Sequence, residues 1–185
     1  MTDVAWEIGG PPYFVEGAYE SPLERLFAHH AVKYFKLGLD LQTQVGVVTP
    51  IGRFRLDFVV DTSSVRVGFE CDGAAYHEAL GLWARDRTRD EAILRAGRLD
   101  AVVRLPGRSL VFRPEDCFYV LRQWYAELFA DRAGWILEHL ASAEVKTAAR
   151  PDSDLVEFPY RYEGPSDDPP DIARFSMHRR RLHTP

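Results

Sequence analysis

Three acidic residues, Asp57, Glu70 and Asp72, fall on two neighbouring stretches in which apolar and polar residues alternate. Alternation of this kind is typical of a strand with one buried face, and residues two apart in a strand project from the same face. Glu70 and Asp72 therefore share a face. The polar residues at 61–64 predict a tight turn that folds the second strand back on the first. The pattern thus predicts several carboxylates on one face of a β-hairpin.

The turn geometry decides how close these carboxylates come. We expect a two-residue loop at 62–63, which places Asp57 opposite Gly68. Glu70 is then the diagonal neighbour of Asp57 on the same face, about 7–8 Å away at the backbone. Gly68 has no side chain and is expected to leave open space beside Asp57.

Carboxylates that share one sheet face repel each other and resist ionising together. A hard divalent cation removes that penalty, and an oxygen-only site with few protein ligands suits Mg²⁺ or Mn²⁺, which keep bound waters and accept phosphate oxygens. Such an ion lowers the pKa of a bound water and stabilises charge on a phosphodiester in the transition state. We therefore predict that Asp57 and Glu70 are metal ligands, with Asp72 beside them.

The alternative is a set of ordinary cross-strand ion pairs between these acids and the nearby arginines Arg53, Arg55 and Arg66. Pairs of this kind are common on half-exposed strands and contribute little to stability. They account for Asp57 taken alone. They account less well for an acidic group that also lies near His77, because clustering the acids brings no evident gain in stability.

Three further candidates for the site are Glu24, His77 and Asp86, and each also has an ordinary explanation. Glu24 is explained by a capping box at the start of a helix. His77, in the loop after the second strand, could orient or deprotonate an attacking water, or could be a hydrogen-bonded surface histidine. Asp86 and Asp90 could be helix-surface partners of neighbouring arginines.

Composition restricts the class of protein more than its partners. The chain has 185 residues, of which 46% are hydrophobic and 28% charged, as in one soluble globular domain. The net charge of −5 argues against a nucleic-acid partner. However, every basic residue from 85 to 113 is an arginine, and a local patch can contact phosphates on an acidic chain. We consider Arg85 and Arg89 candidate DNA contacts, with solvated helix-surface arginines as the alternative.

Two further features bear on where the chain works. No apolar run reaches the length of a membrane helix, and the first residues have neither a basic nor an apolar leader region. We therefore expect a cytoplasmic protein without a membrane partner. The two cysteines do not make a disulfide framework or, by themselves, a zinc site.

The predicted elements give a mixed α/β sheet with helices on both sides, built from an antiparallel meander and a crossover helix. Ser21 caps a helix that ends at Gly38, and a later helical region breaks near Gly134. Phe54, Leu56, Phe58 and Val60 are expected to share one face of their strand. The predicted elements are strands at 40–48, 53–61, 65–72 and 99–105, and helices at 21–37, 80–97 and 114–143.

These elements divide the chain into three parts. Residues 1–20 are expected to form an irregular N-terminal arm, and residues 21–145 the folded domain. Residues 146–185 are rich in Pro, Asp and Arg, and we expect a tail that is extended over the surface or disordered.

The motifs, taken in order, resemble a known family. Ser21-Pro22 and Glu24 open a helix, Phe54-Arg55-Leu56-Asp57-Phe58 forms a strand, and Glu70-Cys71-Asp72-Gly73 is followed by His77. Asp86, Arg89-Asp90, Leu94 and Gly97 come next. This set, over residues 20–125, resembles the very-short-patch-repair-like nucleases of bacteria in the PD-(D/E)xK, restriction-endonuclease-like superfamily. It is also similar to homing nucleases with an E-D-x-H-D pattern.

The resemblance implies metal-dependent hydrolysis of DNA phosphodiesters. It places Glu24, Asp57, Glu70, His77 and Asp86 around the active site, with Asp57 as the first acid of the superfamily motif and Glu70 as its second. Asp72 falls where the superfamily has lysine, and His77 is the residue that could take over water activation. The structural zinc cluster of the mismatch-repair members has no counterpart here, so mismatch repair is not implied. Double-strand cutting would need a homodimer or two successive nicks. The alternative to an enzyme is a nuclease-like module that binds DNA or protein without catalysis.

Overall fold

The computed structural model describes residues 19–73, 80–148, 155–162 and 171–180. Its centre is a six-stranded mixed sheet with the strand order β1-β2-β3-β4-β6-β5. The strands are β1 (Asp40–Thr49), β2 (Gly52–Asp61), β3 (Arg66–Asp72), β4 (Ala101–Pro106), β5 (Leu155–Tyr162) and β6 (Asp171–Arg179).

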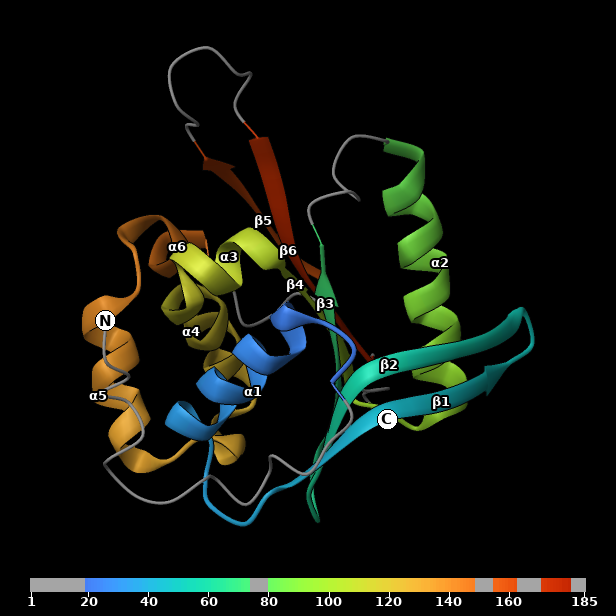
Figure 1. Ribbon diagram of the computed structural model, residues 1–185, viewed down its shortest axis with the longest axis horizontal. Coiled ribbons are helices and arrows are strands. Elements are labelled where there is room, and N and C mark those ends of the chain that lie inside the picture. Colours follow the sequence, from blue (N-terminus) through green and yellow to red (C-terminus); the bar gives the residue numbers. More distant parts are fainter. Residues whose placement is uncertain (1–18, 74–79, 149–154, 163–170, 181–185) are drawn as a thin grey trace, which may run out of the picture.

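Helices cover both faces of the sheet. Figure 1 shows α2 (Leu80–Gly97) alone on one side and the remaining helices together on the other. The remaining helices are α1 (Pro22–Tyr34), α3 (Gly107–Phe112), α4 (Pro114–Trp124), the 3-10 helix η3 (Ala126–Leu128), α5 (Asp131–Leu140) and α6 (Ala143–Ala148).

The expected α/β class and the first part of the topology are confirmed. β1, β2 and β3 form an antiparallel meander, and β4 pairs in parallel with β3 after the crossover through α2. Parallel neighbours need a long connection, and α2 supplies it. The predicted bounds of α2 are also confirmed.

The larger core lies between the sheet and α1 and α4. Phe27 of α1 contacts Phe58, Phe69 and Phe118, with ring centroids 4.8, 4.9 and 5.9 Å away. The first two pairs are tilted and the third is stacked, and aromatic rings at these separations pack favourably. The smaller core lies under α2 and joins Ile93 to residues of β1, β2 and β4.

α1 begins as predicted but ends earlier. The Ser21 side chain accepts a hydrogen bond from the Glu24 backbone N–H at 3.2 Å, and Pro22 opens the helix. The predicted end at Gly38 is wrong, because the helix ends at Tyr34. The predicted break near Gly134 is also wrong. Gly134 lies within α5 and packs against Arg122, whereas the chain leaves the helix after Trp124.

β1 and β2 each change face part-way along. Leu56 and Phe54 pack in the smaller core under α2, whereas Phe58 and Val60 pack in the larger core. The expectation that all four share one face is therefore wrong. The change occurs at Asp57, and on β1 the facing residue is Gln44, whose φ of 54° interrupts regular strand geometry. Figure 1 shows the resulting bend, with the β1–β2 hairpin sweeping past one end of α2.

The β2–β3 turn is longer than predicted. Asp61 pairs with Arg66 and Val59 with Gly68, so the loop has four residues rather than two. The reason is the Thr62 hydroxyl, which accepts a hydrogen bond from the Val65 backbone N–H at 2.9 Å and closes the wider loop. The register moves by two residues, which leaves the side chains of β3 on their predicted faces.

The C-terminal segment joins the sheet, and the expectation of a surface-extended or disordered tail is wrong for it. β6 pairs with β4, and β5 pairs with β6. Phe175 and Met177 are fully buried in the larger core. Strands from both sides of the predicted boundary at residue 145 therefore belong to one sheet. In the described residues, no helix is long and apolar enough to span a bilayer.

One prediction concerns His30 on α1, which stacks on Tyr34 and lies near Phe118. Burial, with help from His29 and Lys33, lowers the pKa of His30 to about 4. The unfolded chain takes up this proton near pH 6.5, but the folded chain resists it down to about pH 4. Stability is therefore lost as the pH falls through this window.

In urea unfolding at pH 7 and pH 5, His30→Gln should lose less stability than the wild type. The exposed His139→Gln is the control and should follow the wild type; identical slopes for all three would refute this account.

Candidate functional site

Asp57 is positioned by the backbone of β3. The β2–β3 ladder runs from Asp61 to Phe58 and stops there, and the Asp57 carboxylate takes over the pairing. Its Oδ2 accepts a hydrogen bond from the Cys71 backbone N–H at 2.7 Å. Because Cys71 lies between Glu70 and Asp72, this bond places the Asp57 carboxylate against the segment of β3 that carries both acids.

Glu24 approaches the same place from α1, and its side chain does more than cap the helix. The carboxylate is buried and accepts hydrogen bonds from the Glu20 backbone N–H at 2.9 Å and from Gln44 Nε2 at 2.8 Å. Gln44 faces Asp57 across the strand pair. The capping box therefore does not fully explain Glu24.

Glu70 is held between two guanidinium groups. Arg89 of α2 pairs with its Oε1, and Arg104 Nη1 of β4 lies 2.8 Å from its Oε2. Glu70 and Arg104 are register partners on neighbouring strands, so both side chains project toward α2. The alternative pairing of Glu70 with Arg55 or Arg66 is wrong. Arg55 pairs with Glu20 and Arg66 pairs with Asp61.

Further acids surround Arg104. Asp90 of α2 binds it with both oxygens, at 3.1 Å from Nε and 2.8 Å from Nη2. Asp72 lies 3.5 Å from Nη1 and Asp86 lies 3.8 Å from Nη2. His178 of β6 contacts Asp90 through Nδ1 at 3.1 Å. Asp90 is only 1% exposed, so the alternative that it pairs with arginines on the helix surface is wrong.

Burial dominates the electrostatics of the acids. Burial raises the pKa of Asp57, and Glu24 and Asp72 raise it further. Burial also raises the pKa of Glu70 to about 7, against the opposing attraction of Arg104 and Arg89. Asp72 has a raised pKa for the same reason, with Asp86 and Asp90 adding to the effect. The charged forms of these three acids are therefore disfavoured, chiefly because the carboxyl groups are buried.

Asp90 behaves in the opposite way. Burial alone would raise its pKa, but hydrogen bonds from His178 and Arg104 hold the pKa below its usual value. Arg104 is likewise buried, a change that disfavours its charge, yet Glu70, Asp90 and Asp72 raise its pKa. This half of the cluster is therefore a fixed ion pair, whereas Asp57, Glu70 and Asp72 are the acids that gain from an added cation.

Gly68 does not leave the open space that we expected. It pairs with Val59 under α2, and a Cβ there would lie 2.7 Å from Leu56 Cδ1. The expectation failed because the four-residue turn moves Gly68 away from Asp57 and into the smaller core.

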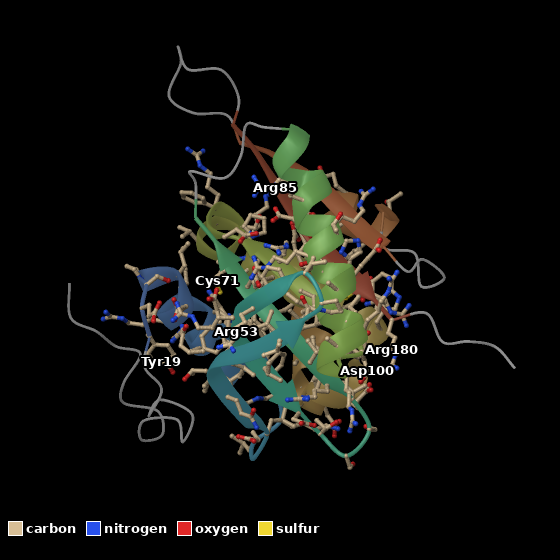
Figure 2. The ribbon with its side chains drawn as sticks, turned by 90° about the vertical axis from the view of Figure 1, so that its right-hand side faces the viewer. Tyr19, Arg53, Cys71, Arg85, Asp100 and Arg180 are labelled. Atoms are coloured by element: carbon tan, nitrogen blue, oxygen red, sulfur yellow. The ribbon has the colours of Figure 1, made fainter. Side chains whose placement is uncertain are left out.

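The predicted DNA contacts have different surroundings. Arg85 is exposed on α2. Figure 2 shows Arg85 toward one end of this helix and Asp100, which follows the helix in the chain, toward the other end. Arg89 is half-buried, with its guanidinium 5.1 Å from the centre of the Phe54 ring. Arg104, which the sequence grouped with them, is 5% exposed. The arginines of residues 85–113 therefore do not form one surface patch.

His77 lies outside the described residues. Among the residues that the structure does describe, no three His, Cys, Asp or Glu side chains are grouped so as to hold a metal ion. Near Glu24, the Oε1 atom of Gln44 is buried without a hydrogen-bond partner. Buried polar atoms are normally satisfied, so this oxygen marks a place for a donor or a cation beside Glu24.

Sequence reasoning missed three residues of this cluster: Arg104, His178 and Gln44. For Arg104 a signal was present, because it is the one charged residue in an otherwise apolar strand and a charge there requires partners. His178 and Gln44 carry no such local signal.

No protein-family model, curated protein or solved structure matches this chain. The chemistry of the site therefore has to be inferred from its own residues.

The buried ion pair gives a prediction for stability. Asp90→Ala leaves Arg104 without its bidentate partner and should lower the free energy of unfolding by about 3–5 kcal/mol. Glu91→Ala is the matched control on the same helix. Glu91 forms an exposed pair with Arg95, so its loss should cost at most about 1 kcal/mol. Urea unfolding of both variants measures the difference, and equal costs would show that Asp90 is not held as described.

Proposed function

We propose that this chain is a metal-dependent DNA endonuclease of the PD-(D/E)xK, restriction-endonuclease-like kind. The observation that carries the proposal is the bond from the Cys71 backbone to Asp57, which holds the Asp57 carboxylate against the segment of β3 that carries Glu70 and Asp72. The order of helix, meander, crossover helix and parallel strand supports the same fold assignment.

The donor set fits Mg²⁺ or Mn²⁺. Mg²⁺ is usually bound by one or two carboxylates together with waters and substrate phosphates, so Asp57 and Glu70 would suffice as protein ligands. Burial raises the pKa of both acids, because it disfavours their charged forms, and a bound cation would favour those forms. When bound, the ion would activate a water and stabilise charge on the phosphodiester.

Glu70 must release one arginine before it can ligate an ion. The Arg89 side chain is 25% exposed, whereas that of Arg104 is 6% exposed and is held by Asp90. Arg89 is therefore the partner that can leave. Once released, it would lie on α2 with the exposed Arg85, where both could contact DNA phosphates.

The remaining residues would manage water and protons. Glu24 and Gln44 form a hydrogen-bonded pair beside Asp57, and the unpartnered Gln44 Oε1 would accept a hydrogen bond from a water there. His77 is proposed to take the proton from the attacking water or give one to the leaving group. Cleavage of both strands would require a homodimer or two successive nicks.

A second function is a nuclease-like module that binds DNA or protein without catalysis. The observation in its favour is the state of Glu70, because both of its oxygens are held by arginines. Such a module would keep these ion pairs permanently and would bind no divalent ion.

The test is cleavage of plasmid DNA with Mg²⁺ or Mn²⁺ by the wild type and by Asp57→Asn. The substituted amide oxygen can still accept the Cys71 N–H bond, so the fold should be retained while the charge is lost. Cleavage should fall by at least about 100-fold, since a metal ion contributes several kcal/mol to the transition state.

The matched control is Asp61→Asn, on the same strand but at its far end, where Asp61 pairs with Arg66 at the surface. It should cleave like the wild type. Full activity in Asp57→Asn would reject the assignment of Asp57. A wild type that binds DNA but neither cleaves it nor binds Mn²⁺ in calorimetry would favour the non-catalytic module.

A further inference from the structure

Arg104 is a buried charged residue at a position where an apolar residue would be expected. It lies in β4, with Val103 and Leu105 on either side, and both of these neighbours are buried. Its register partners are Glu70 on β3 and Ser176 on β6, and α2 covers it. A buried charge network is often no more stable than an apolar replacement of similar volume, so stability alone is weak ground for an arginine here.

The two ends of the guanidinium group have different partners. Asp90 binds Nε and Nη2 in a bidentate pair at 3.1 and 2.8 Å, which fixes the plane of the group. The remaining nitrogen, Nη1, points at Glu70 Oε2 at 2.8 Å and lies 3.5 Å from Asp72. One edge is thus an anchor and the other presents a donor to the acids of the site.

The anchor is itself held by the C-terminal part of the chain. His178 Nδ1 contacts Asp90 Oδ2 at 3.1 Å, and His178 is buried on β6. A continuous chain of contacts therefore runs from β6 through α2 and β4 to Glu70 on β3.

We propose that Arg104 is a positioning residue that sets the Glu70 carboxylate for the metal ion, and that Asp90 and His178 hold Arg104 in place. The β5–β6 hairpin is then a working part of the site and not an appendage to it. This inference rests on the proposed nuclease function and deepens it, because it assigns the second layer of residues behind Glu70.

The test compares full-length variants in three measurements: Mn²⁺ binding by calorimetry without DNA, kcat and KM for an oligonucleotide at saturating Mn²⁺, and thermal unfolding. Arg104→Lys keeps the charge but loses the planar fork that spans Asp90 and Glu70. Its Mn²⁺ affinity and its kcat should each fall by about 10–100-fold. Its KM for DNA should change little, since the exposed arginine Arg85 is untouched.

His178 gives a milder variant in case Arg104→Lys does not fold. His178→Ala removes the contact that holds Asp90 and should lower Mn²⁺ affinity and kcat in the same direction. His178→Asn places an amide N–H near the position of Nδ1 and should restore most of the loss. Rescue of this kind is not expected if His178 only fills space.

Asp116→Asn is the control for a general loss of stability. Asp116 is as buried as Asp90 but binds Ser142 among the helices on the other face of the sheet. This variant should melt at a lower temperature and still bind Mn²⁺ like the wild type. If Asp116→Asn weakens Mn²⁺ binding as much as His178→Ala does, the role of His178 is structural and the inference is overturned.

The remaining outcomes separate the inference from the function on which it rests. A wild type that binds Mn²⁺ and cleaves DNA, alongside folded Arg104 and His178 variants within about twofold of it, would overturn the inference and leave the nuclease proposal standing. A wild type that neither binds Mn²⁺ nor cleaves would overturn both.

Discussion

The buried charge of Arg104 is the constraint on which the arrangement around it depends. A guanidinium group under α2 is tolerated only if acids surround it, and these come from two elements: Asp90 and Asp86 from α2, and Glu70 and Asp72 from β3. α2 must therefore present one particular face to the sheet. The space between α2 and the sheet is divided accordingly into a charged part and the smaller apolar core around Ile93. A shift of α2 along the sheet would separate Arg104 from its acids and leave a buried charge without a partner.

A second constraint acts at the bend in the β1–β2 hairpin. At Asp57 the ladder with β3 gives way to a side-chain bond, and on β1 the facing Gln44 adopts a positive φ. The two strands change faces together. Their halves next to the β1–β2 turn pack under α2, and their other halves pack on the α1 side of the sheet. Because the ladder opens at this point, Glu24 can reach Gln44 from the α1 side while Glu70 faces α2. The bend is what allows acids from both layers to meet.

The sequence predicted elements whose signals are local, and it missed features set by distant partners. The start of α1 follows from Ser21 and Pro22, and the bounds of α2 follow from residues within it. The β2–β3 register was wrong because a single hydroxyl, that of Thr62, favours a wider loop. β6 was missed because its partner is β4, some seventy residues away, and its composition resembles that of a tail. Arg104 could have been recognised, since a lone charge in an apolar strand demands buried partners.

The register error left the faces of β3 unchanged for a physical reason. A strand that slips by two residues keeps each side chain on its face, so Glu70 and Asp72 still share one face of β3, toward Arg104. Burial, with the nearby acids Asp72 and Asp90, raises the pKa of Glu70, so positive charge beside it is favourable. Arg104 and Arg89 supply part of that positive charge. They differ in freedom, however, because Asp90 fixes Arg104 whereas Arg89 is partly exposed. Under the proposed function, a metal ion would replace Arg89 and leave Arg104 in place, so that Glu70 stays aligned while one of its oxygens changes partner.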